Sequence, residues 1–432
     1  MSEKLAILGG PQAAPAGTLK PWPPITQADR DALMSVLDTG LSSVNTPNID
    51  ALEKEWSEYL GIAHTLMTNS GTAALHMAVA ATGIGPGDEV IIPAYTFLAS
   101  ASCVLHHNAI PIFADVHYET GNIDASKIEE KITERTKAVM PVHINGMSAD
   151  LDEVIAVARR HNLLVIEDAC QAHGATYKGK KVGTFGDASG FSLNYFKNLT
   201  GIEGGFFVTD DDEYRAKARM VREFGETVHR GKKRAYNSYT MGWMYRSTEF
   251  NAAFVRSQLR RLDAMNALRI ANARMLNCEL SKLPGLGVTQ EPADRQGVYW
   301  FYPIWLDPVK AGMEKVAPAV FRGAVERAVS AEGLRVGLWQ TVPVPSQMLF
   351  REQVGYGKGC PWTCPHYKGR VRYAEEVYPM AQKFIDHVTW LVTGYGAPNT
   401  ANEMDFILAA FRKVFDHLDE AVDYHVKNPH EG

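Results

Sequence analysis

Short β-rich runs alternate with helical runs along the first half of the chain, and this rhythm constrains the fold more than any other feature. Strands separated by helices of about ten to fifteen residues predict βαβ units and a mainly parallel sheet covered on both faces. In such a sheet, ligands bind at the carboxyl ends of the strands. Strands are predicted at 64–69, 89–94, 110–116, 137–144 and 163–169, with helices at 71–84, 96–109, 125–133 and 150–162.

The flanking regions follow other patterns. The stretch 23–40 predicts a loop that leads into a helix, and apolar residues at helical spacing predict a second helix at 48–62. A long, bent amphipathic helix is predicted at 251–284, and a strand at 297–306 opens an α+β unit. Because 432 residues exceed one compact core, we predict three parts: an N-terminal arm (1–24), a large α/β domain (25–284) and a small C-terminal α+β domain (285–432).

The composition excludes several classes of protein. A net charge of −5, from 44 basic and 49 acidic residues, gives no nucleic-acid footprint. No apolar run reaches the roughly 20 residues needed to cross a bilayer, and the N-terminus lacks the apolar region of a signal peptide. Five scattered cysteines indicate reduced thiols in a cytoplasmic protein. Cys360 and Cys364 lack the CxxC spacing and a completing cluster, so no metal site is expected.

The stretch "TNSGTAAL" places Ser70, Gly71 and Thr72 just before a predicted helix. The free N–H groups and positive dipole end of a helix N-terminus attract phosphate. Gly71 lets the backbone approach a ligand, and Thr72 adds a hydroxyl donor. The same three residues also form an ordinary helix N-cap, so this motif alone leaves both interpretations open.

Two further stretches carry candidate reactive groups. "VIEDACQAHGA" places Asp168 at the end of an apolar strand, where a carboxylate either faces a cation or caps the next loop. In "FSLNYFKNLTGIEGG", Ser192 offers a second hydroxyl and Lys197 precedes a glycine-rich turn. Lys197 is either a solvated surface lysine or a sheltered lysine that forms a Schiff base.

The order of these motifs decides between the alternatives. A phosphate cradle, an aromatic segment, a strand-end aspartate and a lysine before a glycine-rich turn follow one another in an α/β chain. Pyridoxal phosphate needs a lysine for its aldehyde, an acid for its ring nitrogen and donors for its phosphate. The combination therefore predicts a pyridoxal phosphate site.

The chain resembles the DegT/DnrJ/EryC1/StrS family of sugar and cyclitol aminotransferases, which have the aspartate aminotransferase fold (fold type I). The resemblance spans about residues 20 to 265. Two shorter stretches, "DPVK" and "CPW", look like the branch that aminates inososes in aminoglycoside assembly. The matching stretches are "TNSGTAALHMAVAATGIGPGDEVIIPAYTFLAS", "FADV", "TKAVMPVHINGMSADLDEV", "VIEDACQAHGATYKGKKVGTFGD", "FSLNYFKNLTGIEGG" and "EFNAAFVRSQLRRLD".

The resemblance assigns roles to individual residues. It implies that Lys197 is the Schiff-base lysine, that Asp168 is the partner of the pyridine nitrogen, and that Gln171 lies near the cofactor's phenolic oxygen. Phe97 takes the place of the aromatic ring that stacks on the cofactor. Phosphate contacts are implied for Gly71, Thr72 and Ser192.

Three positions are implied to line the substrate site. His143 and His173 match recurrent site-lining positions, although a satisfied structural histidine is an equal interpretation for each. Arg246 is retained from the family pattern Gly-x-Asn-x-Arg. The resemblance also implies a homodimer with the active site shared at the subunit interface.

The sequence departs from the family pattern near the presumed site. Met244 stands where the family has an asparagine that reaches the partner's cofactor phosphate, and methionine donates no hydrogen bond. Ile202 replaces the first glycine of the family's Gly-Glu-Gly-Gly turn, and its branched side chain is stiffer. Thr341 and Pro345 replace a tyrosine and a histidine of the inosose branch.

We therefore expect a pyridoxal phosphate-dependent aminotransferase that moves an amino group from glutamine or glutamate to a keto-sugar or keto-cyclitol, in antibiotic or other natural-product biosynthesis. Lys197 would shuttle the proton as general base and acid. One alternative keeps the cofactor but performs dehydration and aromatisation, as in aminohydroxybenzoate synthase. Another is a non-catalytic sensor of the cofactor or of an amino sugar.

Overall fold

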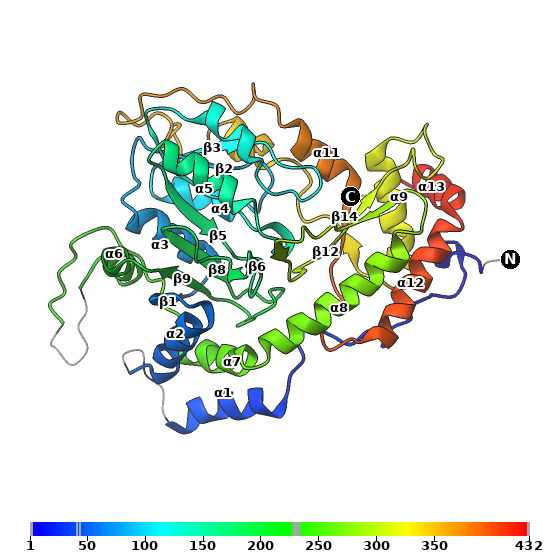
Figure 1. Cartoon of the computed structure of the whole chain (residues 1–432), viewed down its shortest axis with the longest axis horizontal. Coiled ribbons are helices and arrows are strands. Elements are labelled where there is room, and N and C mark those ends of the chain that lie inside the picture. The colour runs from blue at the N-terminus through cyan, green and yellow to red at the C-terminus, as the bar shows by residue number, and fades with distance from the viewer. Residues whose placement is uncertain (1–2, 40–41, 43–44, 228–233, 430–432) are drawn as a thin grey trace.

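The computed structural model describes residues 3–39, 42, 45–227 and 234–429. At its centre is a seven-stranded sheet in the order β1-β9-β8-β5-β4-β2-β3 (Figure 1). The pairings from β8 through β5, β4 and β2 to β3 are parallel, whereas β9 is antiparallel to both its neighbours. The predicted α/β class with a mainly parallel sheet is confirmed. The strands are β1 (His64–Thr68), β2 (Glu89–Pro93), β3 (Ile110–Ala114), β4 (Thr136–Val139), β5 (Leu164–Asp168), β8 (Ala188–Ser192) and β9 (Gly205–Thr209).

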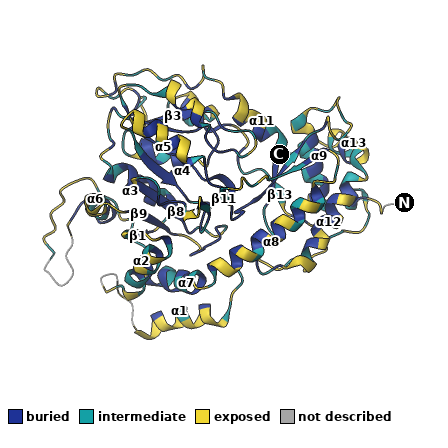
Figure 2. Ribbon diagram, in the orientation of Figure 1, coloured by how far each residue is buried: buried dark blue, intermediate teal, exposed yellow. Residues whose placement is uncertain are grey.

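Helices cover both faces of this sheet, because alternate strand residues point to opposite sides. In β9, Phe207 belongs to the same hydrophobic cluster as Leu75 of α3, while Phe206 packs with Trp56 of α2 on the other side. Figure 2 shows the sheet strands as buried and α1 as largely exposed. The helices of this unit are α1 (Gln27–Thr39), α2 (Pro47–Leu60), α3 (Gly71–Ala81), α4 (Ala99–His106), α5 (Leu151–Arg160), α6 (Asp212–Arg222) and α7 (Glu249–Leu259).

Two predicted helices differ from the structure. The predicted helix at 125–133 is a pair of short 3₁₀ turns, Ala125–Lys127 and Glu129–Lys131. The long helix expected at 251–284 is broken into α7 and α8 (Leu262–Leu280). Arg261 leaves helical geometry at the break, and its guanidinium contacts Asp29 at 2.7 Å. This ion pair ties α1 to the point where the helix bends.

A second unit follows α8 and contains an antiparallel sheet in the order β10-β12-β14-β13. Helices α8 and α9 contact this sheet, and α12 and α13 pack against these helices, on the right of Figure 1. A separate three-stranded sheet joins β11 to the β6–β7 hairpin. The elements are β10 (Leu286–Val288), β11 (Arg295–Gln296), β12 (Tyr302–Leu306), β13 (Val336–Gly337), β14 (Val388–Leu391), β6 (Thr176–Tyr177), β7 (Lys180–Lys181), α9 (Pro318–Ala331), α12 (Ala401–Phe415) and α13 (Leu418–Lys427).

The hydrophobic clusters cross the predicted boundaries at two places. Leu5 and Ala14 of the N-terminal arm pack in the core of the second unit. Conversely, the segment with η5 (Val344–Ser346), α10 (Met348–Arg351) and α11 (Pro379–His387) packs on the large sheet. We therefore propose the division at 24 and 284 with this returning segment assigned to the large unit. Within the described ranges, no helix has the length and apolar character that would let it span a bilayer.

Candidate active site

The N-terminus of α3 and the end of β8 meet at the carboxyl edge of the sheet. Ser70 caps α3, because its Oγ accepts the backbone N–H of Ala73 at 3.1 Å. A Cβ atom on Gly71 would lie 2.6 Å from Ser192 Cβ, so only glycine permits this close approach. The structure thus brings Ser70, Gly71, Thr72 and Ser192, all expected to contact phosphate, to one place beside the free N–H groups of a helix.

Asp168 ends β5 and is almost fully buried, at 4% exposure. Its Oδ2 accepts a hydrogen bond from Ser100 Oγ at 2.6 Å, and its Oδ1 accepts the backbone N–H of Cys170 at 3.1 Å. Ser100 in turn lies 2.7 Å from Thr96 Oγ1. These donors stabilise a buried carboxylate at the edge where ligands bind in parallel sheets.

Lys197 lies in the loop between β8 and β9 and is buried. Burial lowers its pKa to about 8, although electrostatic interactions with Cys170 and Asp168 favour the charged form. Its Nζ lies 3.7 Å from the ring centroid of Trp300, in a cation–π contact. The same Trp300 donates its indole N–H to the Phe196 carbonyl at 3.0 Å, so it supports the loop as well as the lysine.

Gln171 and Phe97 occupy different environments. Gln171 is buried, and its Oε1 accepts the backbone N–H of Asn145 at 2.7 Å. Phe97 follows β2 and is 58% exposed, with its ring 6.4 Å from that of Trp339. Phe97 is therefore on the open side of this region, where a ring is free to cover a ligand.

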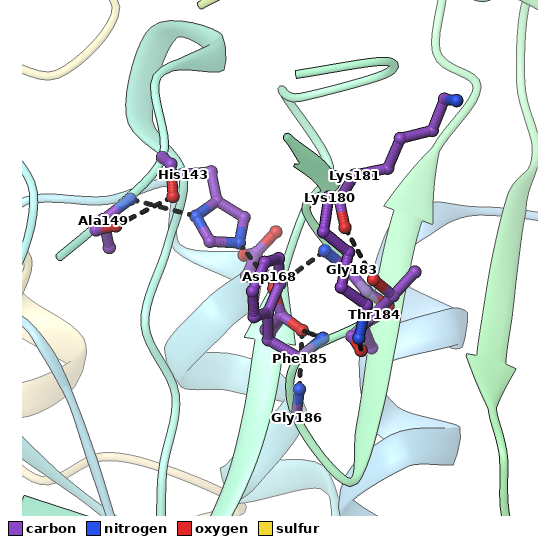
Figure 3. Close-up of polar contacts among 12 residues, drawn as sticks. His143, Ala149, Asp168, Lys180, Lys181, Gly183, Thr184, Phe185 and Gly186 are labelled. Atoms are coloured by element: carbon purple, nitrogen blue, oxygen red, sulfur yellow. Dashed lines mark hydrogen bonds and ion pairs between the residues drawn. The ribbon is translucent and has the colours of Figure 1, made fainter. Parts of the chain in front are cut away.

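Both ring nitrogens of His143 make hydrogen bonds to other residues of the protein (Figure 3). Its Nδ1 accepts the N–H of Ala149 at 3.1 Å, so Nε2 carries the proton and donates to Glu167 Oε2 at 3.0 Å. Glu167 is fully buried and also accepts the backbone N–H groups of Gly183, Phe185 and Gly186. Burial opposes ionisation of Glu167, but these donors, His143 first, hold its pKa below the usual value. His143 thus anchors a buried carboxylate, and its substrate role stays a prediction.

His173 is enclosed by aromatic rings, with Trp56 at 6.0 Å and Phe191 at 5.6 Å between ring centroids. Burial, and then the charge of Lys197, lowers its pKa to about 3, so the ring is neutral. An interaction with the Ser192 backbone favours the charged form, but it does not offset the burial of the ring. Arg246 is partly exposed, and its guanidinium lies 5.9 Å from the Phe224 ring centroid. Substrate contacts of His173 and Arg246 stay predictions.

The positions that depart from the family pattern border this region. Asn69 directly precedes Ser70. It donates its backbone N–H to the Tyr245 carbonyl and its side-chain N–H to the Met244 carbonyl. The Met244 side chain itself is half exposed. Ile202 has a left-handed backbone with φ of 70°, which is strained for a branched residue. Pro345 is buried beside Val344, whose N–H bonds the Ala94 carbonyl at the end of β2.

Three contacting residues were absent from the sequence prediction: Ser100, Trp300 and Asn145. Ser100 was hidden in a predicted helix and Trp300 in a predicted strand, and no local signal marks either one. Asn145 directly follows the predicted strand at 137–144, a position that by itself implies no particular role. In the described part of the chain, no cluster of His, Cys, Asp or Glu side chains could hold a metal ion, and all five cysteines are free.

The profile of the DegT/DnrJ/EryC1/StrS aminotransferase family matches residues 23–368. A GDP-perosamine synthase of Caulobacter vibrioides is 43% identical over 282 residues, which cover 64% of this chain and 74% of that protein. A putative L-glutamine:3-amino-2,3-dideoxy-scyllo-inosose aminotransferase of Streptomyces kanamyceticus is 32% identical over 98% of this chain and its own full length. The solved structure of DesV from S. venezuelae matches with a TM-score of 0.76 and 30% identity, over 90% of this chain and 94% of DesV.

Proposed function

The chain belongs to the DegT/DnrJ/EryC1/StrS aminotransferase family, and from this premise we propose that it moves an amino group from glutamine or glutamate to a keto-sugar or keto-cyclitol. Enzymes of this family use pyridoxal 5'-phosphate, and the chain is such an aminotransferase of the sugar type. The observation that carries the proposal is Lys197, a buried amine with a pKa of about 8 beside Asp168.

The side chains of this region fit the cofactor. The N-terminus of α3 offers N–H groups where Gly71 and Ser192 are in contact, and a phosphate group suits such a cradle. Asp168 is a buried carboxylate, which suits a protonated ring nitrogen. Lys197 is sheltered, and the lowered pKa leaves part of the population neutral near pH 7.

When bound, the cofactor supplies an aldehyde for attachment and a ring that stabilises negative charge beside it. The chain's own part is to hold and move protons. Lys197 Nζ, with a pKa near the working pH, can accept a proton and return it during one cycle. Asp168 holds the proton on the ring nitrogen, and Ser100 keeps its carboxylate oriented by donating to Oδ2.

Aromatic side chains support a ring-shaped acceptor. Trp300 lies under Lys197, and Trp339 lies 6.1 Å from Trp300 and 6.4 Å from Phe97, measured between ring centroids. Flat aromatic surfaces suit the C–H faces of a sugar or cyclitol ring. The inosose aminotransferase named above aligns over nearly the whole chain, which favours a cyclitol and a natural-product pathway.

We also propose a homodimer with a shared site. The segment at 236–244 exposes four large apolar side chains, and its end borders the cradle through Asn69. A second copy covering this segment would bury that surface and complete the site. The four side chains are Tyr236, Tyr239, Met241 and Met244, exposed by 77%, 67%, 70% and 50%.

The visible spectrum of the protein with pyridoxal 5'-phosphate tests the proposal. Addition of glutamine or glutamate should bleach the absorption band and release the corresponding keto acid, and a panel of keto-cyclitols and keto-sugars should restore the band. If no common amino donor bleaches it, the aminotransferase proposal fails, and the redirected dehydration and aromatisation becomes the favoured alternative. A Lys197→Ala variant that keeps full biological effect would favour a sensor.

A further inference from the structure

Asn145 connects three parts of the molecule that are distant in the sequence. It is 6% exposed and has a left-handed backbone, with φ of 55° and ψ of 16°. Its backbone N–H donates to Gln171 Oε1 at 2.7 Å, and its carbonyl accepts the backbone N–H of Trp300 at 2.8 Å. Its side-chain Oδ1 accepts the indole N–H of Trp390 in β14 at 2.9 Å. One residue therefore joins the loop after β5, the loop before β12 and the small antiparallel sheet.

Two of these partners belong to the candidate site. Because Gln171 Oε1 accepts the N–H of Asn145, the orientation of the amide is fixed, and its Nε2 N–H groups on the other branch are left to donate to a ligand. Trp300 carries Lys197 Nζ on its ring face at 3.7 Å. Asn145 thus fixes both the direction of the Gln171 amide and the place of the ring beneath the reactive lysine.

We propose that Asn145 is a positioning residue that directs the N–H groups of Gln171 and the ring of Trp300 toward the cofactor, and that Trp390 locks it in place. The inference rests on the proposed function. Both links to the site use backbone atoms, so their direction depends on the left-handed backbone. Asparagine tolerates this conformation better than most residues. The side-chain bond to Trp390 then couples the conformation to the small sheet.

A chemical consequence follows for Lys197. An N–H donor at the phenolic oxygen of the cofactor competes for that oxygen with the proton on Nζ, once Nζ has joined the cofactor. Loss of the donor leaves the oxygen free to hold that proton. Misdirecting Gln171 should therefore raise the pKa of this proton and weaken cofactor binding.

Reconstitution with pyridoxal 5'-phosphate tests the inference without measuring turnover. The pH titration of the visible band gives the pKa of the proton on Nζ, and a fluorescence titration gives the cofactor Kd. In Asn145→Ala, we expect the pKa to rise by about one unit and the Kd to rise about tenfold. Asn145→Gly should change both by less, because glycine adopts the left-handed backbone without cost.

Matched variants separate this role from general destabilisation. Trp390→Phe should change the pKa and the Kd as much as Asn145→Gly does. The double variant Asn145→Gly/Trp390→Phe should show no larger change than either single variant, because all three lack the hydrogen bond between Asn145 and Trp390. Asn108→Ala is the control, since Asn108 is also left-handed, with φ of 58°, and its hydrogen bonds go to Leu105 and Cys360. It should leave pKa and Kd unchanged.

The outcomes also separate the inference from the function on which it rests. Wild-type protein that forms the band, with Asn145→Ala showing the same pKa and Kd, overturns the inference alone. If Asn145→Ala does not fold, unchanged values in Asn145→Gly and Trp390→Phe overturn it equally. Wild-type protein that never attaches the cofactor at Lys197 overturns both.

Discussion

Ser100 Oγ lies 2.6 Å from Asp168 Oδ2, although the two residues are 68 positions apart in the sequence. Ser100 lies in the first turn of α4, and Asp168 ends β5. The contact turns a strand-end carboxylate into one with a defined orientation. Substituting Ser100 and Asp168 separately should therefore lower activity to different extents.

Asp168→Asn should lower kcat/KM on the order of 100-fold or more, because the neutral amide cannot hold a proton on the cofactor's ring nitrogen. Ser100→Ala should lower kcat/KM by about tenfold or more, since a hydrogen bond to a charged group contributes about 1.5–3 kcal/mol. Steady-state kinetics with glutamine measure both. Thr96→Ser, which keeps the hydroxyl next to Ser100, is the control and should retain activity. Equal activity of Ser100→Ala and wild type would contradict the assigned orientation.

Lys197→Met should stabilise the cofactor-free protein at pH 7. The pKa of Lys197 falls from 10.5 to about 8 on folding because of burial, so below pH 8 the folded protein carries a buried charge. Between pH 8 and 10.5 Lys197 is neutral in the folded state but still charged in the unfolded state. Its destabilising effect therefore becomes smaller as the pH rises through this range. The gain is at most on the order of 3 kcal/mol at pH 7 and disappears near pH 10.5. Thermal unfolding at several pH values measures it; a lower Tm at pH 7 would refute the burial argument.

Ile202→Gly should raise the free energy of unfolding by about 1 kcal/mol, because φ of 70° is costly for a branched residue and free for glycine. Chemical denaturation measures the change. Ile202→Ala removes the same half-exposed side chain but retains the left-handed cost, so it should gain less. If both variants are equally stable, the turn at Ile202 is not strained.

Glu167→Gln should destabilise the protein at pH 7 by about 2–4 kcal/mol, since the amide N–H₂ would oppose backbone donors that now bond the carboxylate. The pKa of Glu167 is lower in the folded state, so its contribution is present above the unfolded value near 4.5 and is lost as the pH falls through the folded value. The difference between variant and wild type should therefore shrink below pH 4.5. Glu134→Gln is the control, because Glu134 is an exposed acid whose pKa is also lowered, by its own backbone and by Arg135, and it should show a much smaller difference.

Much of this arrangement could be predicted from the sequence. The period of the apolar residues gave α3 and its neighbouring strands, because burial on one helix face or both sheet faces leaves a local pattern. The cluster of Ser70, Gly71 and Thr72 could also be found from the sequence, because these residues lie next to each other at the start of a helix. By contrast, the segment at 125–133 was wrongly predicted as a helix, since too few apolar residues support one.

The order of motifs, from Ser70 through Asp168 to Lys197, was by itself enough to indicate a cofactor class, because the chemistry of pyridoxal phosphate demands those residue types. Only the tertiary structure decided what surrounds them. Trp300 contacts both Lys197 and Asn145, and each of these residues is more than 100 positions away from it in the sequence. Asn145 also bonds Gln171. Such contacts depend on how whole elements pack against one another, and no local pattern of residues encodes that packing.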